Sequence, residues 1–193
     1  KLYYEKQKYK KAIKHFRDAL ENISEQHKDY CNIQLWLGHC YYEIYDYKNA
    51  EESYKKILSS KLASVEEVTE AQIYLGHVYS QQKEYVKAVK EYEKLLEMSP
   101  KQKEELDILY RLGTTYVQLG EKPKAIDYFQ KIITGNLATP LRESTLYRLA
   151  CLYIEQERYK EFNECSQLLV NEFPDGPLSK KILEYRKKGE FQN

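Results

Sequence analysis

The sequence predicts an all-α fold in which pairs of helices follow one another as a tandem array of repeats. Only 7 Gly and 5 Pro occur among 193 residues, too few for a turn-rich all-β fold or a disordered chain. Apolar side chains recur three and four positions apart, as in Leu109, Leu112 and Tyr116, which is the spacing of one helix face. A short motif also returns at a nearly constant interval, which is the mark of a repeat protein.

The recurring motif has the form Leu-small-x-x-Tyr and occurs four times. Its small residue is Gly38, Gly76, Gly113 or Ala150, so the period is 37 or 38 residues. Twelve positions after each glycine comes an alanine, and four positions further comes an aromatic residue: Ala50 and Tyr54, Ala88 and Tyr92, Ala125 and Phe129. We therefore expect each copy to be a pair of antiparallel helices that cross closely where the small residues lie.

The first and last copies depart from this pattern. Tyr3 and Tyr9 open an incomplete copy, so we expect further repeats upstream and an open N-terminal end that favours self-association. In the fourth copy Ala150 replaces glycine, Phe162 replaces alanine and Ser166 replaces the aromatic residue. We expect the larger Phe162 either to push that helix pair apart or to be offset by the smaller Ser166.

Capping residues mark where the first helix of each copy begins. Ser64 followed by Glu67 predicts a capping box, and Ser99 and Thr139 give similar signals in the next two copies. Gly120 is expected to end a helix. These caps lie well upstream of each Leu-small pair, so the residues beyond the common 34-residue repeat should lengthen the first helix by about one turn.

With these columns in register, the sequence resembles the tetratricopeptide repeat (TPR) family, which places Leu-Gly-x-x-Tyr on a first helix and Ala-x-x-x-Phe on a second. The resemblance covers about residues 3–174. It implies a right-handed α-α superhelix, a TPR solenoid with long repeats of 37–38 residues. We expect one continuous solenoid domain with these parts: a partial unit 1–30, units 31–68, 69–105 and 106–142, a divergent unit 143–175, and a C-terminal capping helix and tail 176–193.

Charge and cysteine usage restrict the function. The 31 basic and 30 acidic residues leave a net charge of +1, which argues against a nucleic-acid partner. No apolar run reaches the roughly 18 residues that a membrane-spanning helix needs. The 4 cysteines form no CxxC pair, and free thiols fit a reducing compartment, so we expect a cytoplasmic protein.

No catalytic or metal-binding motif occurs in the chain. HExxH, G-x-S-x-G, glycine-rich phosphate loops and paired-cysteine spacings are all absent from the sequence. His39 and His77 share a repeat column, but two polar residues on neighbouring helices explain this better than a metal site. We therefore expect a protein without enzymatic activity, cofactor or metal.

The family resemblance implies a binding groove on the concave face, which first helices line. The repeat positions on the first helices that would face this groove are therefore the predicted site. Arg111 and Arg148 occupy the adjacent column and are expected to engage an acidic partner. The predicted partner-binding residues are Leu35, His39, Tyr42, Ile73, His77, Tyr110, Arg111, Thr114, Tyr147, Arg148 and Cys151. The alternative is that these columns only pack on neighbouring repeats or on the C-terminal helix.

Two functions follow from this reading. The first is a non-catalytic protein–protein interaction scaffold that binds a peptide or helix of a partner in its groove. The second is a periplasmic or envelope assembly factor, because Glu172-Phe173-Pro174-Asp175 resembles the helix-ending turn of bacterial envelope members with long repeats.

Overall fold

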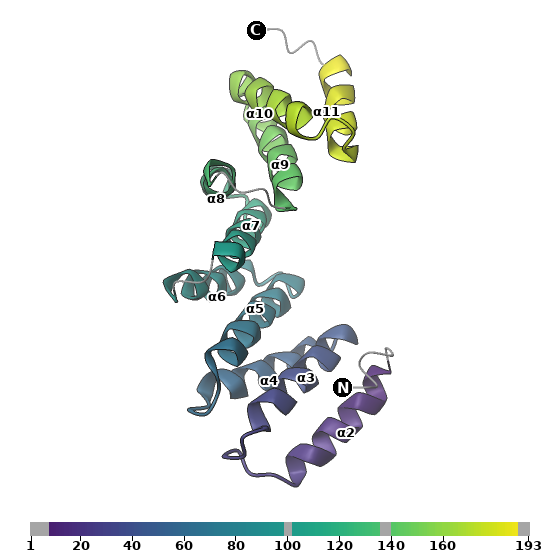
Figure 1. The fold of residues 1–193 in the computed structure, drawn as a ribbon, viewed down its shortest axis with the longest axis vertical. Coiled ribbons are helices and arrows are strands. Elements are labelled where there is room, and N and C mark those ends of the chain that lie inside the picture. The colour runs from purple at the N-terminus through teal and green to yellow at the C-terminus, as the bar shows by residue number, and fades with distance from the viewer. Residues whose placement is uncertain (1–7, 99–101, 136–139, 189–193) are drawn as a thin grey trace. The chain divides into compact units, whose positions relative to one another are not determined.

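The computed structural model describes residues 8–98, 102–135 and 140–188, and these residues contain α-helices and no strands. The predicted all-α fold is confirmed. The helices, drawn in Figure 1, are α2 (Tyr9–Glu21), α3 (Tyr30–Glu43), α4 (Tyr47–Ser59), α5 (Val65–Gln81), α6 (Tyr85–Glu97), α7 (Gln102–Gln118), α8 (Lys122–Thr134), α9 (Leu141–Glu155), α10 (Tyr159–Glu172) and α11 (Pro177–Lys188).

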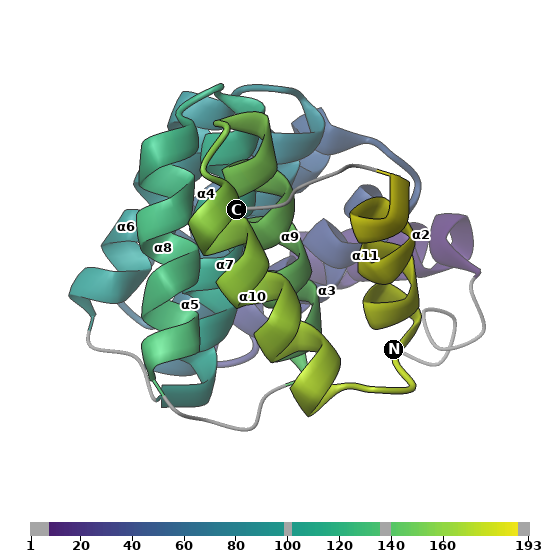
Figure 2. The same ribbon diagram turned by 90° about the horizontal axis from the view of Figure 1, so that it is seen from above.

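The helices fall into two compact units, which divide between residues 99 and 100. Unit 1 contains α2 to α6, in which α3 packs on α4 and α5 packs on α6, while α2 packs on α3 and α4 on α5. Unit 2 contains α7 to α11, with α7 on α8, α8 on α9 and α9 on α10. The last helix, α11, lies against both α9 and α10, as the two views agree (Figure 1 and Figure 2).

The glycine of each Leu-Gly motif lies at the crossing of its helix pair. A Cβ atom at Gly38, Gly76 or Gly113 would come closer than 3.0 Å to the aromatic ring of the partner helix. These rings belong to Tyr54, Tyr92 and Phe129, which are almost completely buried, as are Ala50, Ala88 and Ala125 one turn earlier. The predicted close crossing is confirmed, because only a hydrogen atom leaves room for the ring.

The fourth pair, α9 and α10, solves the same packing problem differently. Ala150 and Phe162 are fully buried, and Ser166 stands fully buried in the column that holds an aromatic ring in the other pairs. The large side chain has thus moved one turn along α10, and the small side chain of Ser166 makes room for it. Of the two expected outcomes, the structure favours the one in which the smaller Ser166 compensates for the larger Phe162.

In each of the four pairs the first helix is longer than the second, and in two of them the difference is about one turn. Both α5 and α7 span 17 residues, whereas α4, α6 and α8 span 13. Ser64 caps α5 in the predicted capping box with Glu67, whose side chain accepts from the Ser64 N–H. The expected unit boundaries after residues 68, 105 and 142 fall inside α5, α7 and α9, and in α5 the Ser64 cap starts the helix upstream of the boundary. Ser99 and Thr139, like Tyr3, lie outside the described residues.

In each of the four helix pairs, a residue with a left-handed backbone follows two positions after the end of the first helix. The φ angles are 62° at Tyr45, 61° at Lys83, 78° at Gly120 and 56° at Glu157. This conformation reverses the chain before the second helix begins, and Gly120 adopts it without strain. The other three positions hold side chains that prefer φ below zero.

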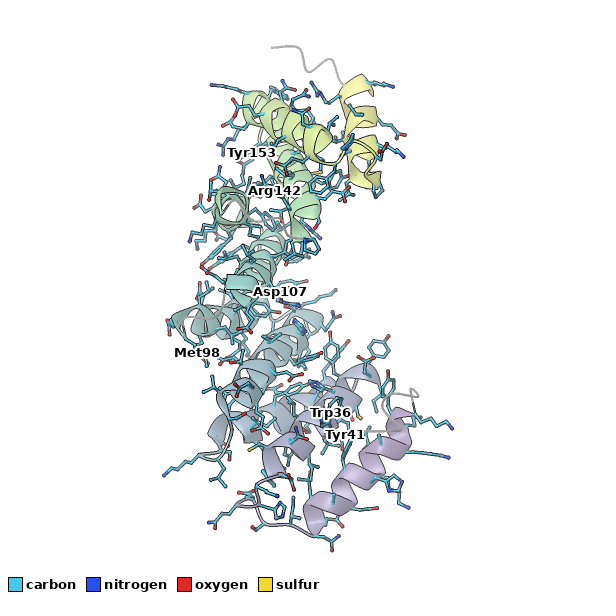
Figure 3. All side chains as sticks on the ribbon, viewed as in Figure 1. Trp36, Tyr41, Met98, Asp107, Arg142 and Tyr153 are labelled. Atoms are coloured by element: carbon cyan, nitrogen blue, oxygen red, sulfur yellow. The ribbon has the colours of Figure 1, made fainter. Side chains whose placement is uncertain are left out.

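In unit 2, hydrogen bonds from Arg142 connect α9 to the ends of both α8 and α10. Arg142 on α9, labelled in Figure 3, donates from Nε and Nη2 to the two carboxylate oxygens of Glu172, over 2.5 and 2.8 Å. Its Nη1 donates to the backbone oxygen of Ile133 over 2.9 Å, at the C-terminal turn of α8 where carbonyl groups lack helical partners. One guanidinium group therefore joins three successive helices.

Candidate functional site

Two of the predicted groove residues in unit 1 are buried. Leu35 is 4% exposed and His39 is 3% exposed, so neither is available to a partner on the surface. The prediction placed them on an open face, but α3 packs on α2, α4 and α5 and is covered on three sides. Tyr42, Ile73 and His77 are partly exposed and keep a surface position.

His39 joins three helices through both nitrogens of its ring. Nε2 lies 3.1 Å from Oε1 of Glu70 on α5, and Nδ1 lies 2.9 Å from the hydroxyl of Tyr54 on α4. A carboxylate only accepts, so Nε2 donates to Glu70, while Nδ1 shares a hydrogen bond with the Tyr54 hydroxyl. Hydrogen bonding to His39 lowers the pKa of Glu70 from its usual range. His39 is therefore a packing residue of unit 1.

An aromatic surface adjoins His39 on α3, α4 and α5. We use this name for Trp36, Tyr42, Tyr45, Tyr47, Tyr74 and His77, whose side chains are partly or largely exposed. The ring centroids of Tyr42 and Tyr74 are 5.8 Å apart, as are those of Tyr42 and Tyr47, while Tyr74 lies 5.2 Å from His77. Trp36 packs edge-on against His39, with ring centroids 5.7 Å apart.

Trp36 and Tyr74 were not among the predicted residues, although they occupy one repeat column directly before the leucine of the motif. The prediction took the neighbouring column of Leu35 and Ile73 as the centre of the face, and from the column of Trp36 it included only Arg111 and Arg148. The signal was present, since Trp36, Tyr74, Arg111 and Arg148 share that column. In α3 the burial of Leu35 shifts the accessible face toward Trp36.

In unit 2, α7, α9 and the start of α11 enclose a cavity of about 370 Å³, which we call the α7–α9 cavity. Four predicted residues meet there: Tyr110, Tyr147, Arg148 and Cys151. The remaining lining residues are Val117, Ser144, Leu152, Glu155 and Leu178. Most of these side chains are apolar or aromatic, so the cavity suits an apolar group with a polar or charged neighbour.

The two tyrosines of the α7–α9 cavity each stand beside a cation. Arg148 donates from Nε to the Tyr110 hydroxyl over 2.9 Å, and its guanidinium carbon lies 5.5 Å from the centre of that ring. Nζ of Lys181 on α11 lies 5.1 Å from the centre of the Tyr147 ring. Burial is the main cause that raises the pKa of Tyr147, so its hydroxyl stays protonated at neutral pH.

Two other predicted residues of unit 2 do not line the cavity. Arg111 donates from Nε to Asp107 one turn earlier on α7 over 2.6 Å, and Figure 3 labels this carboxylate. Thr114 donates to the backbone oxygen of Arg111 over 2.8 Å. Since Asp107 compensates the charge of Arg111, Arg148 remains the arginine that the cavity presents to a partner.

The last contributor to the cavity, Leu178, comes from α11. Its backbone N–H donates to Oε1 of Glu143 on α9 over 3.3 Å, which places a carboxylate at the N-terminal turn of α11. Ser179 donates to the backbone oxygen of Leu169 and is fully buried. These contacts seat α11 on the preceding pair and close one side of the α7–α9 cavity.

Burial raises the pKa of the Cys151 thiol, so this cysteine is not an activated nucleophile. Among the described residues, no group of three or more His, Cys, Asp or Glu side chains is placed to hold a metal ion. No helix in the same part of the chain is long and apolar enough to cross a membrane.

Sequence profiles identify the repeats. Two profiles described as tetratricopeptide repeat match residues 32–63 and 67–136, which together make up more than half of the chain. The chain belongs to the tetratricopeptide repeat family. TPR proteins are generally non-catalytic scaffolds for protein–protein interaction. No curated protein matches the sequence significantly.

Solved TPR structures resemble the chain in fold at low sequence identity. YrrB, described as a TPR protein with an unusual peptide-binding site, is 16% identical with a TM-score of 0.70, over 95% of this chain and 87% of its own. MamA from Desulfovibrio magneticus is 17% identical with a TM-score of 0.70, over 88% of each chain. PilF from Pseudomonas aeruginosa is 17% identical with a TM-score of 0.67, over 95% of this chain and 77% of its own. These likenesses establish the fold of the TPR array.

Proposed function

We propose that this TPR protein is a non-catalytic module that binds a segment of a partner protein in the α7–α9 cavity. The observation that carries the proposal is the meeting of Tyr110, Tyr147 and Arg148 around a cavity of about 370 Å³. Tyrosine and arginine are the residue types that dominate binding energy at protein interfaces. The peptide-binding site named for YrrB supports the same kind of partner.

The charges around the cavity define the segment further. Arg148 and Lys181 contact tyrosine rings, whereas Glu155 pairs with Lys122 over 3.0 Å. A carboxylate on the bound segment can therefore reach Arg148 without displacing an existing ion pair of that arginine among the described residues. We propose a segment with one large apolar side chain in the cavity and an acidic residue beside it.

The proposed place of action is the cytoplasm. The four cysteines are free thiols, which supports a reducing compartment. The envelope alternative rests on the turn at Glu172, and in the structure this residue pairs with Arg142, an arrangement that any compartment permits. No observation on the described residues favours the envelope function over the interaction module.

The double variant Tyr110→Ala with Tyr147→Ala tests the proposed function. Affinity capture from the source organism identifies the proteins bound by the wild type, and the affinity of a captured partner is then measured for each variant. We expect a loss on the order of tenfold for each 1.4 kcal/mol of binding free energy removed. Tyr159→Ala with Tyr185→Ala is the matched control, because both tyrosines are exposed in unit 2 and do not line the cavity.

Thermal unfolding followed by circular dichroism separates binding from stability. We expect a small change of Tm for the double variant, because both rings are partly exposed. Unchanged affinity with early melting would show that the tyrosines only cover α11 and the neighbouring helix, and the binding face would then lie elsewhere.

A further inference from the structure

Unit 1 separates its charges by helix. Every Lys and Arg in its helices lies on α2, α4 or α6, whereas α3 and α5 contain none. The charged residues of α3 and α5 are all acidic: Glu43, Glu66, Glu67 and Glu70. The side-chain carboxylates on α3 and α5 therefore have no Lys or Arg on the same two helices to offset them, in contrast to the cavity of unit 2 with its arginine.

The carboxylates share helix faces with the aromatic surface. Glu66, Glu70 and Tyr74 follow one another at four-residue intervals on α5, so they lie along one stripe. On α3, Trp36 and Glu43 are seven residues apart, which again places them on one face. Tyr42, on the neighbouring face of α3, contacts Tyr74 of the α5 stripe across the two helices, with ring centroids 5.8 Å apart. Figure 3 labels Trp36 on α3.

The most exposed ring of the surface is Tyr45. Its side chain is 78% exposed, and its ring centroid lies 6.2 Å from that of Tyr47, which continues the series toward Tyr42. The faces of aromatic rings carry negative charge and attract Lys and Arg side chains. Rings and carboxylates on one face both attract cations, and the carboxylates repel acidic or phosphate-bearing partners.

From this arrangement we propose that the aromatic surface of unit 1 binds a basic segment of a partner protein. Its lysine or arginine side chains lie over the rings of Trp36, Tyr45 and Tyr74, and their charges face Glu43, Glu66 and Glu70. Charge complementarity is the argument for this occupant, since α3 and α5 supply no cation of their own. The proposal stands apart from the α7–α9 cavity, which has the opposite charge preference.

Trp36 is the single tryptophan of the chain, so its fluorescence reports on this surface alone. The probe is acetylated and amidated tetralysine, and tetraglutamate is its matched control. We expect a saturable change of Trp36 emission with tetralysine that weakens as NaCl is added, and no change with tetraglutamate. An unchanged emission with tetralysine, or equal changes with both peptides, would overturn the proposal.

Charge-removing variants test the role of the carboxylates. Glu66→Gln with Glu70→Gln removes two charges, while the amide oxygen at residue 70 can still accept from His39. We expect tetralysine to bind about two- to fivefold more weakly for each carboxylate removed. Glu52→Gln with Glu97→Gln removes the same charge from exposed positions on α4 and α6. Equal losses in the two double variants would mean only general attraction and would refute the assigned surface.

Two more variants separate the rings from the site in unit 2. Tyr45→Ser removes an exposed ring without opening the core, and it should weaken tetralysine binding about two- to fivefold. Tyr110→Ala with Tyr147→Ala should leave tetralysine binding unchanged. A loss of tetralysine binding in that double variant would contradict this inference, whereas a loss of partner capture alone concerns only the function proposed for unit 2.

Discussion

Gly76 on α5 lies directly against the ring of Tyr92 on α6, so that a Cβ atom at residue 76 would stand less than 3.0 Å from three carbons of that ring. Tyr92 is 2% exposed, so its ring is packed inside unit 1. The same relationship recurs between Gly38 and Tyr54 and between Gly113 and Phe129. In these three pairs, the distance between the helices is therefore set by a glycine and a ring.

Replacement of this glycine should separate the two helices. We expect Gly76→Leu to lower the free energy of unfolding by about 1–3 kcal/mol or more, because the new side chain overpacks the crossing. Gly135→Leu is the control, since a Cβ there meets only backbone oxygens at 3.4 Å or more. Urea unfolding followed by circular dichroism measures both variants, and equal losses would show that the crossing tolerates bulk.

The exchange of large and small residues in the fourth pair can be reversed. Phe162→Ala should cost about 3–5 kcal/mol of stability, because it leaves a cavity in a fully buried site. Adding Ser166→Phe and Ala150→Gly rebuilds the glycine, alanine and aromatic arrangement of the other pairs and should recover much of the loss.

The order of these changes provides the control. Without Ala150→Gly, the ring at residue 166 meets the Cβ atom of Ala150, so that double variant should recover less. Thermal unfolding of the single, double and triple variants measures the series. A triple variant no more stable than Phe162→Ala would contradict the offset between residues 162 and 166.

The pairing of Glu172 with Arg142 predicts a dependence of stability on pH. Hydrogen bonds from Arg142 are the largest cause that lowers the pKa of Glu172 in the folded chain. Its ionised form therefore stabilises the fold above the unfolded pKa of about 4.3, and this contribution is lost as the pH falls through the lower folded value. The Glu172 side chain is 29% exposed, so solvent screens the pair and we expect only about 0.5–1 kcal/mol.

Glu172→Gln should accordingly be less stable than the wild type at pH 7 and equally stable near pH 3. Glu164→Gln is the matched control on the same helix, because Glu164 is exposed and forms no ion pair among the described residues. Urea unfolding at a series of pH values gives the comparison. A gap between wild type and Glu172→Gln that persists at pH 3 would show that packing, and not charge, accounts for the effect.

The left-handed backbone at Tyr45 predicts an unusual preference for glycine. Tyr45 has a φ of 62°, which costs a residue with a Cβ atom about 1 kcal/mol or more. We expect Tyr45→Gly to be more stable than Tyr45→Ala by about 1 kcal/mol, measured by urea unfolding. Leu62 is also exposed but has no positive φ, so Leu62→Gly should be no more stable than Leu62→Ala. A glycine that fails to help at residue 45 would mean that the turn relaxes around Tyr45.

The repeat pattern predicted the fold more completely than the site. Close approach of two helices requires glycine at Gly38, Gly76 and Gly113, because a Cβ atom would meet the partner ring. The repeated glycine is visible in the sequence, so the helix crossings could be predicted. The burial of His39 could not be predicted in this way, since it depends on Tyr54 and Glu70 from two other helices.

The α7–α9 cavity was predicted in part. Tyr110, Tyr147, Arg148 and Cys151 belong to repeated columns and were found by their spacing. Leu178 lies after the last repeat, where no column exists, and its place depends on how Glu143 holds the first turn of α11. Contacts of this kind join segments distant in sequence, and no repeating pattern of residues in the sequence predicts them.

The guanidinium group of Arg142, which joins α8, α9 and α10, has a consequence for how unit 2 unfolds. In a repeat array each pair is stabilised by its own contacts and by those with its neighbours, so weakly coupled pairs can open separately. Arg142 adds hydrogen bonds both within the fourth pair and to the end of the third. We therefore expect the third and fourth pairs to unfold together, because displacement of α9 would break the hydrogen bonds of Arg142 to the ends of both α8 and α10.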